Sequence, residues 1–127
     1  MTSQVWQQRA GANWMLANLG EIRSIAQTML DRGARFEALL VSQTKTGNLR
    51  LVWYWDVNGK LFSVESEAAL NTPVPSIVDI YCGADWAERE ARDYYAVTFE
   101  GRASTPPLML RDGDPPGILL RSEGGPR

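Results

Sequence analysis

The chain has 127 residues, the size of one ordinary domain, and its 44% hydrophobic and 22% charged residues are typical of a soluble globular protein. Its formal net charge of −2 gives no general reason to bind nucleic acid or an anionic membrane, and no apolar stretch is long enough to span a bilayer. With no histidine and one cysteine, the sequence offers neither the commonest general base nor a ligand set for zinc or an iron–sulfur cluster, so we expect no cofactor, no metal and no self-sufficient redox enzyme.

Residues 1–18 form an N-terminal arm, in which we expect some helix. Trp6 and Trp14 lie there in a mostly polar background. Two unburied tryptophans are costly, so both are candidates for a partner interface. Residues 19–32 predict an amphipathic helix, because apolar residues recur at three- and four-residue steps, and Gly33 then supplies a C-terminal stop.

The period of the apolar residues changes from helical to strand-like after Gly33. Residues 36–42 predict a strand, and residues 49–56 alternate with a strongly apolar face that carries Trp53 and Trp55. Asn58–Gly59 is the preferred pair for a tight hairpin, and residues 60–66 form the returning strand. The pattern therefore predicts an α+β fold, with one helix beside a three-stranded antiparallel sheet and both tryptophans in the core.

Residues 73–95 predict a short turn followed by a second helix. Ser76 can cap the turn, and Asp85 begins a helix at about residues 85–95 with Glu88 as its capping-box partner. Cys82, between the two, is expected to be a small buried hydrophobe.

The chain becomes rich in proline and glycine beyond residue 101. Residues 102–127 are therefore expected to form an extended docking tail that lies on a surface. The predicted organisation is an arm at 1–18, a domain at 19–101 and this tail.

Glu90 is the charge on the second helix that is hardest to explain. It lies four residues after Trp86 and four before Tyr94, so on this side of the helix its carboxylate is partly buried and needs a partner. We expect it to accept hydrogen bonds from backbone donors at 74–80, or to pair with a cation such as Arg102 or one on the partner subunit. Glu88 is expected on the outer face. The competing interpretation is that all these charges are simply solvated.

The run from Val74 to Tyr81, followed by the run from Asp85 to Tyr95, resembles the signature of a known family. This is the thirty-kilodalton (C) subunit family of respiratory complex I, which includes a small accessory subunit of energy-converting membrane-bound NiFe hydrogenases. Ala96 stands where the family pattern has glycine. The resemblance marks ten residues as family motif and partner contact: Pro75, Asp79, Trp86, Glu88, Arg89, Glu90, Asp93, Tyr94, Gly101 and Arg121.

The tail departs from the family pattern. Arg102–Ala103 replaces the usual His-Pro, Pro106–Pro107 stands where basic residues are expected, and Leu119 stands where a proline is usual. The chain is also short. Both features look more like the hydrogenase branch than the NADH dehydrogenase branch, and both branches remain open.

The resemblance implies a cofactor-free, non-catalytic accessory subunit in the hydrophilic electron-transfer arm of a complex-I-like oxidoreductase. Its implied place is peripheral, on the cytoplasmic side of the cell membrane. Its implied partners are the large NiFe-hydrogenase-like or quinone-site subunit and other subunits of the hydrophilic arm. One alternative is a stand-alone adaptor that kept the fold. Another is an enzyme using Glu88 and Glu90 as paired carboxylates, which is weak because helical residues two apart point to different faces.

Overall fold

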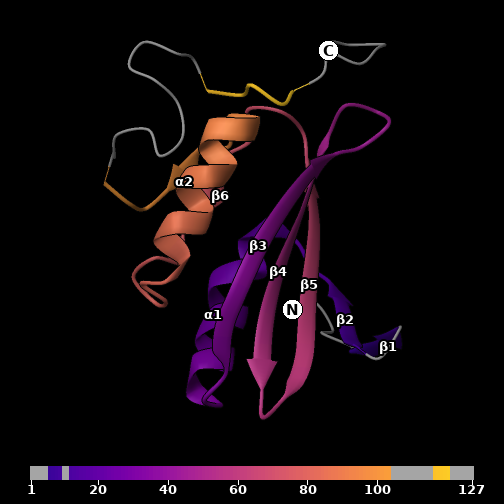
Figure 1. Cartoon of the computed structure of the whole chain (residues 1–127), viewed down its shortest axis with the longest axis vertical. Coiled ribbons are helices and arrows are strands. Elements are labelled where there is room, and N and C mark those ends of the chain that lie inside the picture. Colours follow the sequence, from indigo (N-terminus) through magenta and orange to yellow (C-terminus); the bar gives the residue numbers. More distant parts are fainter. Residues whose placement is uncertain (1–5, 10–11, 104–115, 121–127) are drawn as a thin grey trace.

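The computed structural model describes residues 6–9, 12–103 and 116–120 (Figure 1). These residues form two α-helices, one short 3₁₀ helix and two sheets, which confirms the α+β prediction. In chain order the elements are β1 (Gln7–Arg9), β2 (Ala12–Leu16), η1 (Leu19–Glu21), α1 (Ile22–Asp31), β3 (Arg35–Gln43), β4 (Leu49–Val57), β5 (Lys60–Ala68), β6 (Val74–Pro75), α2 (Ala84–Tyr95) and β7 (Phe99–Glu100).

The larger sheet has the strand order β1-β2-β5-β4-β3. Strands β3, β4 and β5 form the expected antiparallel meander. Asn58 and Gly59, with φ of 52° and 84°, make the tight turn between β4 and β5, because a type I′ hairpin needs two left-handed residues. The predicted core of the fold is therefore confirmed.

Two further strands come from the N-terminal arm. Strand β2 pairs in parallel with β5, and β1 pairs antiparallel with β2. The expectation of helix in residues 1–18 is therefore wrong for the described residues 6–9 and 12–18. The physical reason is that β5 would otherwise end the sheet with a row of unpaired backbone groups, and β2 pairs with them while placing Met15 in the core at 3% exposure.

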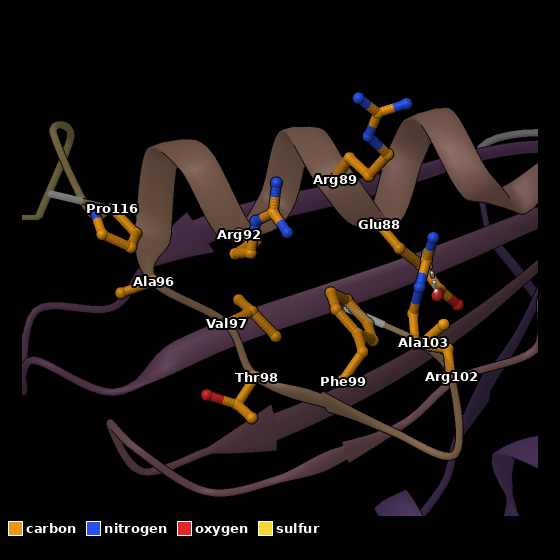
Figure 2. A pocket seen from close by; sticks show the side chains of 10 residues that line it. All are labelled: Glu88, Arg89, Arg92, Ala96, Val97, Thr98, Phe99, Arg102, Ala103 and Pro116. Carbon is orange, nitrogen blue, oxygen red and sulfur yellow. Dashed lines mark hydrogen bonds and ion pairs between the residues drawn. The ribbon is translucent and has the colours of Figure 1, made fainter. Parts of the chain in front are cut away.

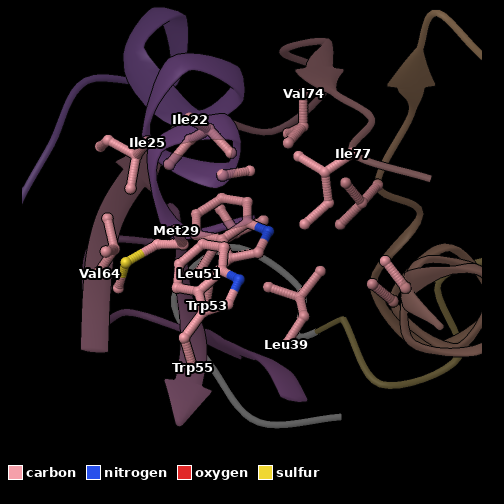
Figure 3. Packing of buried hydrophobic residues seen from close by; sticks show 14 of the residues in the cluster. Ile22, Ile25, Met29, Leu39, Leu51, Trp53, Trp55, Val64, Val74 and Ile77 are labelled. Carbon is pink, nitrogen blue, oxygen red and sulfur yellow. The ribbon is translucent and has the colours of Figure 1, made fainter. Parts of the chain in front are cut away.

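Helix α1 covers one face of this sheet and connects β2 at one side to β3 at the other. Its apolar stripe packs on the large buried side chains of β4, and Trp53 and Trp55 are both fully buried, as predicted (Figure 3). Gly33, with a φ of 75°, ends the helix in a left-handed conformation that favours glycine.

The second sheet is small but joins the chain on either side of α2. Val74 of β6 and Phe99 of β7 are partners in a parallel pair. The C-terminal end of α2 is held by a returning piece of the tail, since Gly117 N and Leu119 N donate to the carbonyls of Asp93 and Tyr94, each at 2.8 Å. The rest of the predicted docking tail, 104–115 and 121–127, lies outside the described residues.

Cys82 is exposed, so the prediction that it is buried is wrong. It lies in the tight turn that leads into α2, where Ala84 N bonds to Tyr81 O at 3.0 Å and Asp85 N to Cys82 O at 3.2 Å. This turn holds the chain at the surface. Neither helix within the described residues is long and apolar enough to cross a membrane.

Candidate functional site

Helix α2 carries most of the motif residues, and its docking decides which of them are buried. It begins at Ala84, and its inward stripe runs through Ala84 and Ala91, which are 0% and 4% exposed. Trp86 is instead 58% exposed. The expected inward position is therefore wrong for Trp86, because the small alanine side chains let the helix approach the core more closely than a tryptophan would, whereas Glu90 and Tyr94 are half-buried.

Glu88 is the buried carboxylate of the site, with 1% exposure. It accepts hydrogen bonds from Ser76 Oγ at 2.6 Å, Ile77 N at 2.9 Å and Arg102 Nη1 at 3.0 Å. A backbone donor at 74–80 and Arg102 were expected as partners of Glu90, but the structure places both on Glu88. The expectations that Glu88 faces outward and closes a capping box are therefore wrong, since three donors stabilise its charge inside the domain.

Arg102 joins the two ends of the motif. The chain turns back after β7 at Gly101, whose φ of 87° is left-handed, and this turn brings Arg102 to α2. Its side chain is 10% exposed and pairs with both Asp85 and Glu88. Partial burial lowers the pKa of Arg102, but the hydrogen bonds to the two carboxylates raise this pKa by more than burial lowers it, so the net shift is upward. The same hydrogen bond from Arg102 holds the pKa of Asp85 below its usual value.

A second ion pair ties α1 to the segment before α2. Arg23 Nη1 donates to Ser76 O at 2.6 Å, and the same guanidinium makes two bonds to the Asp79 carboxylate at 2.7 and 2.8 Å. The hydrogen bonds from Arg23 lower the pKa of Asp79 to about 2. Sequence reasoning marked Asp79 but missed Arg23, because a separation of 56 residues leaves no local signal.

A pocket of about 350 Å³ lies between α2 and the segment around β7 (Figure 2). Its charged lining is Glu88, Arg89, Arg92 and Arg102, and Val97 and Phe99 supply apolar walls. All three donors that the Glu88 carboxylate accepts from belong to the chain itself. Nowhere in residues 6–9, 12–103 and 116–120 do three or more acidic or cysteine side chains gather as metal ligands would. We call the residues joined by these ion pairs and hydrogen bonds, namely Arg23, Ser76, Asp79, Asp85, Glu88 and Arg102, the Glu88 cluster.

The structure brings only part of the predicted motif set into the Glu88 cluster. Asp79 and Glu88 belong to it, Gly101 makes the turn that brings Arg102 to it, and Arg89 reaches it through Asp85 at 3.5 Å. The others lie elsewhere: Pro75 is half-buried in β6, Trp86 is exposed, Glu90 and Tyr94 line a groove between α2 and β3, Asp93 is buried with a carboxylate oxygen 3.5 Å from Arg92, and Arg121 lies outside the described residues.

Comparison with known proteins gives both a family and a fold. Residues 17–123 match the family model described as "Respiratory-chain NADH dehydrogenase, 30 Kd subunit". Among curated relatives, the NADH-quinone oxidoreductase C subunit of Rhodopseudomonas palustris (strain BisB18) is 41% identical over 54 residues, covering 40% of this chain and 27% of the relative. The corresponding protein of Burkholderia mallei (strain SAVP1) is 36% identical over 69 residues, covering 54% of this chain and 30% of the relative. The aligned part of the chain thus spans less than a third of either relative.

A solved structure shares the fold more completely. It belongs to the membrane-bound sulfane sulfur reductase, described as an archaeal respiratory membrane complex. The match has a TM-score of 0.72 and covers 92% of this chain and 73% of that chain, at 23% sequence identity.

Proposed function

The chain belongs to the respiratory-chain NADH dehydrogenase 30 Kd subunit family, and from this premise we propose that it is an accessory subunit in the hydrophilic electron-transfer arm of a complex-I-like membrane-bound oxidoreductase. The observation that carries the proposal is the family match, which takes in both helices, the meander and the whole Glu88 cluster. In this role the subunit binds no cofactor and has no active site of its own.

The Glu88 cluster gives this role a physical basis. Arg102 and Glu88 tie the segment after β7 to α2, while Arg23 and Asp79 tie α1 to the segment before α2. The motif helix is therefore tied through Glu88 to the segment after β7 and to Ser76 and Ile77 before it, and the Arg23–Asp79 pair ties that preceding segment to α1. A partner can then bind a surface whose geometry is already set, which lowers the ordering cost of association.

The partner in this proposal is the large subunit of the same complex, either NiFe-hydrogenase-like or of the quinone-site type. Other hydrophilic-arm subunits complete its surroundings on the cytoplasmic side of the membrane. We favour the hydrogenase branch because Arg102–Ala103 and Pro106–Pro107 replace the family's usual tail residues. The alternatives are the C subunit of a complex I and a stand-alone adaptor that kept the fold.

The test is purification of the tagged full chain from the membranes of cells that make it, followed by identification of the proteins that accompany it. We expect a large hydrogenase-like or quinone-site subunit in a fixed ratio to this chain, and the identity of that subunit decides the branch. A monodisperse monomer with no partner subunit would refute the proposal in favour of the adaptor. Iron or flavin retained by the chain after separation from its partners would refute its cofactor-free character.

A further inference from the structure

The sheet face opposite α1 carries exposed apolar side chains. Strand residues alternate between faces, so Val52 and Tyr54 of β4 point away from the tryptophan core, although Val52 itself is only 1% exposed. Leu40 of β3 is paired with Val52, and Leu61 of β5 is paired with Asp56, so both share this outer face. Leu40 is 55% exposed and Leu61 is 39% exposed. An open hollow of about 590 Å³ lies over this region.

A second groove of about 170 Å³ meets this hollow at Leu40. It runs between α2 and β3 and is lined by Val41, Tyr94 and Leu119, among others. Leu119 is itself 48% exposed. Both depressions are lined by Leu40, and we call the two together the Leu40 surface.

The charged residues that line the hollow and the groove are all acidic, and a cation on the outer face, the exposed Arg35, is paired with Asp56 in the register of β3 and β4. Glu37 and Asp56 line the hollow and Glu90 lines the groove, while no lysine or arginine among the described residues lines either. None of the three makes an ion pair with a described residue, although Asp79, Asp85 and Glu88 all do. Of the partners expected for Glu90, the backbone donor Ile77 N and Arg102 bind Glu88 instead, and a cation on the partner subunit stays a prediction.

A local irregularity places one of these carboxylates. The register of β3 shifts between Phe36 and Ala38, so Glu37 is the extra residue of a β-bulge on an edge strand. Bulges interrupt strand pairing and redirect side chains, and they are frequent beside functional sites. Here the bulge puts Glu37 at the hollow, beside Tyr54 and Leu61.

We propose that the Leu40 surface docks a segment of a neighbouring subunit that presents apolar side chains flanked by lysine or arginine. The proposal rests on the proposed function, which supplies the neighbour, and adds the place and the chemistry of the contact. Charge complementarity selects this occupant, because opposite charges at an interface favour association. A second copy of this chain would place carboxylates against carboxylates, and an anionic lipid surface would be repelled in the same way.

Site-specific photo-crosslinking in the assembled complex tests this directly. A photoreactive phenylalanine derivative replaces Leu40, the complex is purified from the cells that make it, and the crosslinked peptide is sequenced by mass spectrometry. We expect a peptide of another subunit with apolar residues and at least one adjacent lysine or arginine. The matched control places the same group at Leu30 on α1, which is 42% exposed and outside the Leu40 surface, and should give no such peptide.

Charge reversal provides a second measurement. Glu37→Lys combined with Glu90→Lys should lower the fraction of the chain recovered with its partner by about tenfold, corresponding to about 1.4 kcal/mol. Asp31→Lys, an exposed change on α1, is the control. Circular dichroism of each purified variant checks that the fold is kept.

The outcomes separate the two proposals. Crosslinking of Leu40 to a second copy, to an acidic peptide or to nothing within an intact complex overturns the docking inference and leaves the proposed function standing. Unchanged recovery of a folded charge-reversal variant does the same. Absence of any partner for the unmodified chain overturns both.

Discussion

Replacing Glu88 by glutamine tests the buried cluster directly, because the change keeps the shape of the side chain and removes its charge. One carboxylate oxygen accepts from Ser76 Oγ and Arg102 Nη1, and the other accepts from Ile77 N. Whichever way the amide is turned, its NH₂ group meets a donor, either the backbone N–H of Ile77 or the guanidinium of Arg102. At least one buried donor is then left without its acceptor.

The size of the effect follows from these contacts. Removing one partner of a buried ion pair costs about 3–5 kcal/mol. Arg102 keeps its contact with Asp85, and the amide oxygen keeps at least one bond, so we expect the lower end of this range, about 3 kcal/mol. In a domain of this size that loss lowers the melting temperature by about 10 °C.

Thermal and urea unfolding of the full chain, followed by circular dichroism, measure the change in the free energy of unfolding. Glu90→Gln is the matched control on the same helix, and we expect a change within about 0.5 kcal/mol because Glu90 makes no ion pair with a described residue. Combining Glu88→Gln with Arg102→Met should give a coupling energy above about 1 kcal/mol. Equal and small losses for the two glutamine variants, or no coupling, would refute the reasoning.

Three further changes probe neighbouring features. Ala96 ends α2 in a left-handed conformation with a φ of 56°, so Ala96→Gly should raise the free energy of unfolding by about 1 kcal/mol, whereas Ala87→Gly in mid-helix should lower it by about as much. Gly117 has a φ of 93°, and a Cβ there would lie 2.9 Å from Leu120 Cδ1, so Gly117→Ala should lower the melting temperature, and an unchanged value would contradict the observed packing. The folded pKa of Asp79 is lowered from 3.8 to about 2, so its contribution to stability is complete above pH 3.8 and is lost as the pH falls toward 2. Urea midpoints of Asp79→Asn across this interval should therefore fall less steeply than those of the unmodified chain, and parallel profiles would argue against the Arg23 pair.

Much of the fold was accessible from residue patterns because it depends on local chemistry. The alternation along 49–56 predicts β4 and its buried Trp53 and Trp55, and Asn58–Gly59 predicts the hairpin that follows. The strands of the N-terminal arm were harder to predict, because β2 is stabilised by pairing with β5, about fifty residues away. Strands held by such distant partners carry a weak local signal.

The site also combines features that the local sequence predicts with features that depend on distant contacts. The motif residues identified the important helix and the kinds of partner a buried glutamate needs, and the family resemblance was confirmed. The choice between Glu88 and Glu90 was wrong. Helical periodicity allows two stripes on α2, one through Ala84 and Glu88 and another through Trp86 and Glu90.

The sequence by itself therefore determined the helix–meander fold, the family and the helix that carries the motif. The tertiary structure decided that Glu88, and not Glu90, is the fully buried glutamate of this helix. Ala84 and Ala91 allow close approach to the core, and the left-handed turn at Gly101 brings Arg102 to the carboxylate of Glu88. A charge can remain inside a domain only where donors converge on it, and these donors come from segments that meet only after the chain has folded.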